Sequence, residues 1–212
     1  MSRKKQETFR KRYGQWALIA GSAEGMGQAY AETFAGNGLD LLLFDRDGAG
    51  LKAQACALKE RYGVQVRTVR CDLADTAGIE KILDRLDNLE IGMLVFNAAA
   101  SDSGAWLDVP LARKKMVVNV NVLTPLTMVD LLSRKMCARG RGGIILTSSM
   151  SALQGSPRLG VYAGTKAFDL ILGETLWAEL AEHGVDALAF IPGMVKTPSF
   201  ERTGASESAN AF

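Results

Sequence analysis

The feature that most constrains this chain is an apolar run, a glycine-rich turn and a helical stretch in WALIAGSAEGMGQAYAETFAGNG, residues 16–38. The apolar run predicts a buried strand, and the stretch after the turn predicts a helix that ends near Gly38. Gly21, Gly25 and Gly27 have the spacing GxxxGxG. Such a turn lets backbone amides and the helix N-terminus approach a pyrophosphate closely. The pattern therefore predicts a strand–turn–helix unit that binds a dinucleotide.

The cofactor preference depends on the end of a second strand, LDLLLFD, which closes with Asp45 where a ribose should lie. A carboxylate there accepts hydrogen bonds from both ribose hydroxyls of NAD and repels the 2′-phosphate of NADP. Glu24 in the glycine-rich turn adds a second negative charge. Arg46 could instead pair with a phosphate, but between Asp45 and Asp47 it is better explained as their counterion. We expect NAD to be favoured, with NADP possible.

Tyr162 and Lys166 are four residues apart in SMSALQGSPRLGVYAGTK, residues 149–166. On a helix this spacing brings the ammonium close to the phenol, and a fixed cation favours the phenolate. Tyr162 is therefore a candidate general acid and base. Ser149, before the loop that leads into the helix, could hydrogen-bond the same substrate oxygen. A tyrosine and a lysine at this spacing also occur by chance on solvated helices, so other segments must support the assignment.

The pattern SxxxxxxxxxxxxYxxxK resembles the active site of the short-chain dehydrogenase/reductase family. The resemblance implies that Tyr162 exchanges a proton with a hydroxyl or carbonyl while hydride passes to or from nicotinamide. It also implies that Lys166 holds the cofactor ribose and that Ser149 orients the substrate. The glycine-rich turn is similar to the family's TGxxxGIG, with departures at Ala20 and Met26. The cofactor contacts implied in this turn are Gly21, Ser22, Glu24, Gly25, Met26 and Gly27.

Asp72-Leu73, at the end of the strand VQVRTVRCDLA, resembles the family's adenine-contacting dipeptide. Asp72 would accept a hydrogen bond from the adenine amino group. An aspartate at a strand end can equally cap the next helix, and Asp75 is an equally good cap. The two interpretations of Asp72 stay open.

Two more segments resemble family motifs in the same order along the chain. Asn97-Ala98-Ala99 lies where the family shows NNAG, with Ala99 in place of the glycine, and Asn97 is expected to tie neighbouring strands together. Pro192-Gly193-Met194-Val195, with Thr197, resembles the PGxVxT segment that holds the nicotinamide carboxamide. The resemblance covers about residues 16–198.

A long helix is expected from about Pro110 to Arg139, interrupted by Pro125. Because a proline has no N–H, the carbonyl of Asn121 would lack its helical donor, and a water is the natural partner. In the family an asparagine at this place holds a water in a proton relay to the lysine, and the resemblance implies this role for Asn121. Asn119 is the rival assignment, but only Asn121 loses its donor to a proline.

Together these elements predict an α/β fold, a Rossmann-type doubly wound parallel sheet in a single domain with strand order 3-2-1-4-5-6. Residues 14–198 would form the catalytic domain, after a basic arm, 1–13, and before a polar tail, 199–212, that is expected to be mobile. The family usually continues through a substrate lid and one more strand, and we expect both to be missing here.

Composition narrows the class of protein. With 212 residues, of which 48% are hydrophobic, the chain can form one domain with a substantial core. Its net charge of +2 is too small to indicate a nucleic-acid or membrane partner. Cys56, Cys71 and Cys137 form no CxxC or Cys/His cluster, so neither a disulfide framework nor a metal site is expected. We find no signal-peptide core and expect a soluble, cytoplasmic protein.

The sequence also argues against catalysis by histidine. His183, the only histidine, precedes Gly184 at a helix end, where it is best explained as a cap. A Ser-His-Asp hydrolase is therefore excluded.

The helix after Tyr162 is apolar on more than one side, and packing against the sheet can bury only one face of a helix. The family commonly pairs this helix and the preceding long one across a two-fold axis, so the resemblance implies a homodimer or homotetramer.

The expected function is NAD(P)-dependent interconversion of a secondary alcohol and a ketone. Met150, Leu153, Met194 and Phe200 could line a pocket for a hydrophobic substrate, or could simply be packing residues. The alternative is a degenerate family member that binds a dinucleotide as a sensor or scaffold without turnover.

Overall fold

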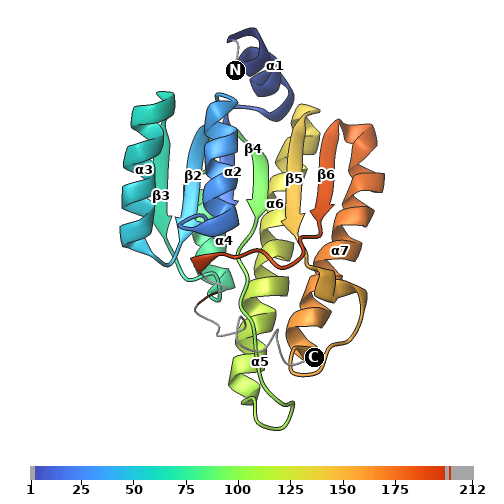
Figure 1. The fold of residues 1–212 in the computed structure, drawn as a ribbon. Coiled ribbons are helices and arrows are strands. Elements are labelled where there is room, and N and C mark those ends of the chain that lie inside the picture. The colour runs from blue at the N-terminus through green and yellow to red at the C-terminus, as the bar shows by residue number, and fades with distance from the viewer. Residues whose placement is uncertain (1–2, 199–200, 202–212) are drawn as a thin grey trace.

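The computed structural model describes residues 3–198 and residue 201 of the chain. Six strands form one parallel sheet in the order β3-β2-β1-β4-β5-β6 (Figure 1). The strands are β1 Trp16–Ala20, β2 Asp40–Asp45, β3 Val66–Arg70, β4 Ile91–Phe96, β5 Gly142–Thr147 and β6 Val185–Phe190. The expected α/β fold and strand order are confirmed.

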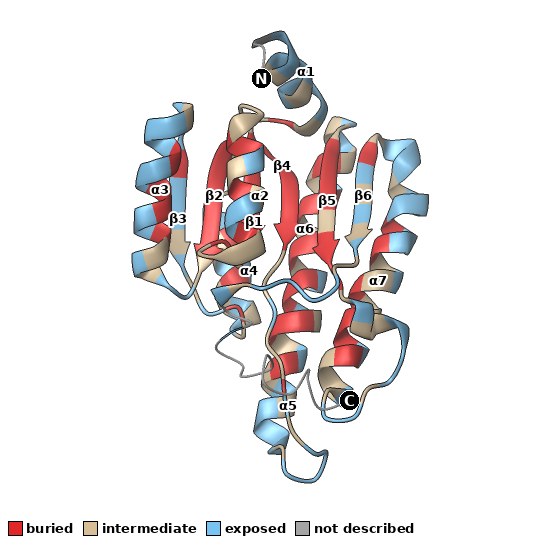
Figure 2. Ribbon diagram, viewed as in Figure 1, coloured by how far each residue is buried: buried red, intermediate tan, exposed pale blue. Residues whose placement is uncertain are grey.

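Helices cover the two faces of the sheet. They are α1 Arg3–Tyr13, α2 Gly25–Gly36, α3 Gly48–Tyr62, α4 Thr76–Arg85, α5 Leu111–Val118, α6 Thr124–Arg139 and α7 Gly160–Leu180, with short turns η1 Asn119–Leu123, η2 Met150–Leu153 and η3 Ala181–His183. One core cluster joins the sheet to α2 and α3, and the other joins it to α4, α6 and α7. The central strands β1, β2 and β4 are mostly apolar because both of their faces are buried (Figure 2). The exceptions in β2 are its two end residues, Asp40 and Asp45.

The edge strand β6 packs on α7 with one face, and its other face is partly exposed. Its burial alternates along the strand, and Leu188 and Phe190 are exposed on the face away from α7 (Figure 2). The alternation of side chains along a strand explains this pattern, because α7 packs on the other face of β6. This edge of the sheet therefore has a partly exposed apolar strip, in which the centre of the Phe190 ring lies 6.5 Å from the centre of the Tyr30 ring on α2.

The long helical run needs one correction. The helix is continuous past Pro125, which lies at the second residue of α6, and the irregular stretch is instead the π-helical turn η1. There the N–H of Thr124 donates to the carbonyl of Asn119, five residues back. A change of hydrogen-bond register just before the proline lets the helix continue, and such π turns are frequent at functional sites.

By length and composition the run Leu111–Arg139 could cross a membrane, but 44% of its most apolar window is buried inside the fold. A core helix of an α/β domain has the same composition, because it buries one face against a sheet.

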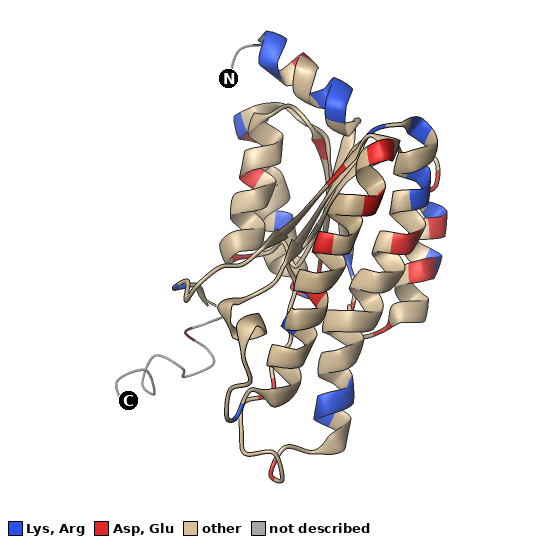
Figure 3. Cartoon of the chain, turned by 90° about the vertical axis from the view of Figure 1, so that its right-hand side faces the viewer, with Lys and Arg blue, Asp and Glu red and all other residues tan. Residues whose placement is uncertain are grey.

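The basic N-terminal residues form α1, which lies beyond the amino-terminal edge of the sheet (Figures 1 and 3). Arg12 and Tyr13 hydrogen-bond to Asp186 of β6 over 2.5–3.1 Å, and Arg10 pairs with Asp40 of β2 at 3.4 Å. These contacts hold α1 at the edge opposite the carboxyl ends of the strands.

Candidate active site

The glycine-rich turn between β1 and α2 is packed tightly against the end of β4. Gly21 has a φ of +78°, and a Cβ there would lie 2.6 Å from the Cα of Ala98. A Cβ at Gly27 would overlap the carbonyl oxygen of Gly21. Asn97 donates from Nδ2 to that same carbonyl at 3.0 Å, which ties β4 to the turn as the sequence suggested. Only glycine fits at these two positions.

The first turn of α2 points its N–H groups toward the carboxyl edge without a side-chain cap. A helix start of this kind, next to a turn without side chains, fits a pyrophosphate. Ser22 is buried, with its hydroxyl directed to the carbonyl of Phe44 at 3.4 Å. The buried Oδ1 of Asn97 has no partner among the described residues. The turn, including Glu24 and Met26, therefore fits a dinucleotide.

Asp45 ends β2 beside this turn, as expected. Its Oδ2 accepts from the N–H of Ala23 at 3.0 Å and its Oδ1 from the N–H of Asp47 at 3.1 Å. In the part of the chain that the structure describes, Arg46 makes no ion pair with either aspartate, so its expected role as their counterion is wrong. Its carbonyl accepts from Arg70 Nε at 3.3 Å, which brings a second arginine to this side of the ribose position.

The residues after β3 separate two alternatives that the sequence left open. Asp75, not Asp72, caps α4, because its Oδ1 accepts from the N–H of Gly78 at 3.0 Å. Asp72 is exposed and accepts from the N–H of Ala74 at 2.9 Å. Leu73 is buried. Burial, with the charges of Asp45 and Asp72, raises the pKa of Cys71 to about 12, so this thiol stays protonated.

Ser149 and Tyr162 both lie at the carboxyl edge of the sheet. Ser149 follows β5 and caps η2, with its Oγ accepting from the N–H of Ser151 at 3.2 Å and from the Ser151 hydroxyl at 2.9 Å. Tyr162 lies in the first turn of α7, where its N–H donates to Oδ1 of Asp102 at 3.0 Å. Asp102 is buried and fixes the start of this helix. The sequence interpretation missed both Ser151 and Asp102.

Lys166 is fully buried one turn further along α7. Its Nζ donates to the carbonyl of Thr147 at 2.7 Å and to Oδ2 of Asp169 at 2.9 Å, and it lies 6.0 Å from the centre of the Tyr162 ring. Ser148 is buried and donates to the carbonyl of Lys166 at 2.7 Å. The sequence interpretation missed Asp169, because an acid three residues after a lysine on a helix is usually a solvated surface pair.

Asn121 is buried in the π turn η1. Its Oδ1 accepts from the N–H of Ala100, and its Nδ2 donates to the carbonyl of Ala100, both at 2.8 Å. Nδ2 also reaches Oγ1 of Thr165 on α7 at 3.0 Å. The side chain therefore ties the segment after β4 to α7. The role of the Asn121 carbonyl in holding a water stays a prediction.

The segment Pro192–Pro198 leaves β6 and crosses the carboxyl ends of the strands toward α2 (Figure 1). Thr197 packs on the glycine-rich turn, since a Cβ at Gly25 would lie 3.0 Å from its Cγ2. Pro192 anchors the segment by accepting from the N–H of Met150 at 3.1 Å. Gly193, Met194, Val195 and Ala99 are exposed, and Phe200 lies outside the described residues.

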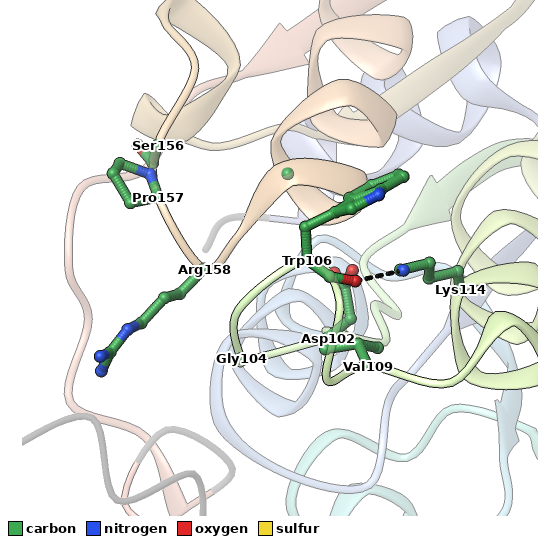
Figure 4. Close-up of a pocket in the computed structure, with 9 residues that line it drawn as sticks. Asp102, Gly104, Trp106, Val109, Lys114, Ser156, Pro157 and Arg158 are labelled. Carbon is green, nitrogen blue, oxygen red and sulfur yellow. Dashed lines mark hydrogen bonds between the residues drawn. The ribbon is translucent and has the colours of Figure 1, made fainter.

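A cavity of about 170 Å³ lies beside the start of α7, between the loops at 101–109 and 156–160 (Figure 4). Trp106, Val109 and Pro157 give it apolar walls. Lys114 donates to the carbonyl of Trp106 at 2.6 Å and lies 3.9 Å from the centre of the indole ring. Arg158, with a φ of 66°, points away from Trp106 (Figure 4). The cavity has mainly apolar walls and adjoins the turn that carries Tyr162.

Comparison with known proteins agrees with this geometry. The model of the short chain dehydrogenase family matches residues 15–208. The chain belongs to this family. This short-chain dehydrogenase is 33% identical to the 7beta-hydroxysteroid dehydrogenase of Collinsella aerofaciens over 191 residues, which are 90% of this chain and 73% of that protein. It is 34% identical to the human very-long-chain 3-oxoacyl-CoA reductase over 188 residues, 87% of this chain and 60% of that one.

Solved structures give the same assignment for this short-chain dehydrogenase. A structure from work on 7beta-hydroxysteroid dehydrogenase stereoselectivity matches with a TM-score of 0.88 and 30% identity, covering 96% of this chain and 80% of that one. A short-chain dehydrogenase from Sphingobium yanoikuyae in complex with NADPH matches with a TM-score of 0.85 and 29% identity, covering 90% and 75%. The protein is an NAD(P)-dependent oxidoreductase.

Proposed function

We propose that this short-chain dehydrogenase interconverts a hydrophobic secondary alcohol and the corresponding ketone, with NAD favoured over NADP. The observation that carries the proposal is that Ser149 and Tyr162 both lie at the carboxyl edge of the sheet, with the ammonium of Lys166 6.0 Å from the centre of the Tyr162 ring. Ligands of open parallel sheets bind at this edge. A phenol and a hydroxyl, with an ammonium nearby and no histidine, suit proton exchange with an alcohol or carbonyl oxygen.

Each residue has a separate task. A bound nicotinamide supplies or accepts the hydride. Tyr162 gives its proton to the carbonyl oxygen in reduction and takes it back in oxidation. Ser149 donates a hydrogen bond to the same oxygen, and Lys166 holds the cofactor ribose and favours the phenolate. Asn121, whose side chain is fixed by Ala100 and Thr165, offers its main-chain carbonyl to a relay water.

The surroundings support a hydrophobic substrate. Met150, Leu153 and Met194 are exposed around the carboxyl edge, where a bound substrate would cover them. The cavity beside the start of α7 has mainly apolar walls as well (Figure 4). Sites for small molecules are mostly apolar with a few polar groups. The names of the relatives, a hydroxysteroid dehydrogenase and a very-long-chain 3-oxoacyl-CoA reductase, agree with a large apolar substrate.

The cofactor assignment depends on the ribose end of the site. Asp45 ends β2, and NAD offers two ribose hydroxyls that can donate to a carboxylate, whereas the 2′-phosphate of NADP is repelled by it. Asp72, Leu73 and the segment around Asn97-Ala98-Ala99 contact the adenosine half. Pro192, Gly193, Val195 and Thr197 hold the nicotinamide carboxamide. Arg46 and Arg70 favour NADP, so the preference for NAD is the part of the proposal most open to test.

The surface supports an oligomer. Ile171 and Trp177 of α7 are exposed, as are Leu123 at the end of η1 and Leu126 of α6. Apolar side chains on two neighbouring helices suit a two-fold contact, and we propose a soluble, cytoplasmic homodimer or homotetramer.

The proposal is tested by turnover. The purified chain is assayed spectroscopically with NAD or NADP and secondary alcohols of increasing apolar size, and in reverse with the ketones. Tyr162→Phe should abolish turnover and leave the dissociation constant of NADH within about threefold, because only the proton-transferring hydroxyl is lost. The matched control is Tyr62→Phe, since Tyr62 is at the end of α3, away from the carboxyl edge. Turnover of Tyr162→Phe within tenfold of wild type would contradict the assignment.

A further inference from the structure

Lys166 and Asp169 form a buried ion pair inside α7, with 2% and 1% of their side chains exposed. They are three residues apart, so they lie on the same face of the helix. Removing a charge from water is costly, and a protein with such a buried pair is often less stable than one with well-packed apolar side chains in its place. A pair of this kind therefore needs a reason beyond stability.

The geometry of the ammonium provides the reason. An ammonium has three N–H bonds. Here one is directed to the carbonyl of Thr147, the last residue of β5, and one to Oδ2 of Asp169. No third acceptor is found for it within the described residues. Two fixed acceptors determine the direction of the remaining N–H bond, and Tyr162 lies one turn earlier on the same helix.

We propose that Asp169 is a positioning residue, which keeps Lys166 charged and aims its remaining N–H bond at the cofactor ribose and Tyr162. The inference rests on the proposed function, in which Lys166 has these two tasks. Asp169 acts through Lys166 and does not touch the substrate. In its absence Lys166 would be a buried amine with only a carbonyl for a partner.

The elements packed against α7 leave Asp169 as the main charge that acts on Lys166. The turns η1 and η2 and the strand β5 contain no ionisable side chain. The other charged or titratable groups on the neighbouring elements are Asp186 of β6, paired with Arg12; Arg113 and Lys114 of α5, which donate to carbonyls; Lys115 of α5; Glu182 and His183 of η3, paired with each other; and Tyr162, Glu174 and Glu179 of α7 itself. Of these groups, Tyr162 is the one found close to the ammonium.

Asp169 does not behave like a group that is there for stability. Burial raises its pKa above the usual value, although the Lys166 charge opposes this. Its Oδ1 is buried and has no partner among the described residues. The charged form is therefore held in the fold at a cost, which fits a role in the site better than a role in packing.

The test compares Asp169→Asn with wild type. Asparagine has nearly the same shape without the charge, so Lys166 should release its proton more readily. We expect kcat/KM to fall at least tenfold at neutral pH and the alkaline limit of activity to move down by about one pH unit. The matched control is Asp130→Asn, which removes an exposed aspartate paired with Arg134 on α6 and should leave the pH profile unchanged. A lower Tm with an unchanged pH profile and an unchanged kcat per folded enzyme would overturn the inference.

A second variant separates the effect of the Asp169 charge from the effect of its position on the direction of the Lys166 N–H bond. Asp169→Glu keeps the carboxylate but moves it by one methylene, so the alkaline limit should stay at the wild-type pH while kcat falls. If Asp169→Asn does not fold, this variant decides alone, because a wild-type kcat would show that the position of the carboxylate is unimportant.

A measurement without turnover separates the inference from the proposed function. The side-chain lysine signals of ¹³C-labelled protein are followed by NMR against pH, and Lys166 is assigned with Lys166→Met. In Asp169→Asn the titration midpoint of Lys166 should fall relative to wild type, and an equal midpoint would refute the role of Asp169. If no alcohol or ketone is turned over, the proposed function fails while this titration still decides whether Asp169 keeps Lys166 charged.

Discussion

The ribose end of the site gives the sharpest prediction, because two arginines and one carboxylate compete there. Replacing Asp45 by asparagine removes the charge and keeps one oxygen that can accept from the N–H of Ala23 or of Asp47. Asparagine is preferable to alanine because Asp45 also tethers the glycine-rich turn. With Asp45→Ala, two backbone N–H groups would lose their acceptor, at about 1 kcal/mol each, and the turn itself could move.

The magnitude follows from the lost contacts. Hydrogen bonds to a charged acceptor contribute about 1.5–3 kcal/mol, and about 1.4 kcal/mol corresponds to a factor of ten in affinity. Asp45→Asn should therefore weaken NADH binding by about tenfold or more. The same change removes the repulsion of the 2′-phosphate and leaves Arg46 and Arg70 to pair with it, so NADPH should bind more tightly than in wild type. The two cofactors should move in opposite directions.

The assay is a titration with each reduced cofactor, followed by nicotinamide fluorescence. Asp47→Asn is the control, since Asp47 caps α3 by accepting from the N–H groups of Ala49 and Gly50, and asparagine caps a helix equally well. It removes a neighbouring charge without changing the carboxylate at the ribose position. A wild type that already prefers NADPH, or a loss of both affinities in Asp45→Asn, would refute the reasoning and assign the pocket to the arginines.

Two further predictions concern stability. Asn121→Ala should lower the free energy of unfolding by about 2–5 kcal/mol, because it leaves the partly buried N–H and carbonyl of Ala100 without the buried side chain that pairs with them. Chemical denaturation measures this loss, and a value below about 1 kcal/mol would contradict the bonds described. Arg12→Ala tests the pKa of Asp186, which partial burial raises but which hydrogen bonds from Arg12 and a neighbouring tyrosine bring below its usual value. A carboxyl group whose pKa is lowered by folding stabilises the folded protein above pH ~4, the pKa in the unfolded chain, and this stabilisation disappears as the pH falls through the lowered pKa. Arg12→Ala should therefore lower the free energy of unfolding by about 0.2–1 kcal/mol at pH 7 and leave it equal to wild type in strong acid. A difference that persists in strong acid would refute this explanation.

The sequence determined the fold because its signals are local. Apolar runs of strand length alternate with helical stretches, and each glycine-rich or polar turn marks where one element ends. Gly21 and Gly27 were recognisable because a tight turn against another backbone leaves no room for a side chain, and their spacing does not depend on distant residues. The order of the strands also followed, since right-handed crossovers allow few arrangements of such units.

The tertiary structure decided which of several similar residues takes each role. Asp75 rather than Asp72 caps α4, and Arg46 pairs with neither of its flanking aspartates. The helix continues past Pro125 because the π turn before it absorbs the change of register. The sequence gives Asp72 and Asp75 the same capability, and only the path of the backbone decides which of the two side chains reaches the helix start.

Asp102 and Asp169 are two residues whose roles the sequence alone did not reveal. Asp102 is distant in sequence from the Tyr162 N–H that it accepts from, so no local pattern links them. Asp169 is close to Lys166 in sequence, but an acid three residues from a lysine is usually a solvated pair on a helix surface. Only the packing of α7 against β5 and β6 removes water from both groups, and this burial turns an ordinary surface pair into a constraint on the site.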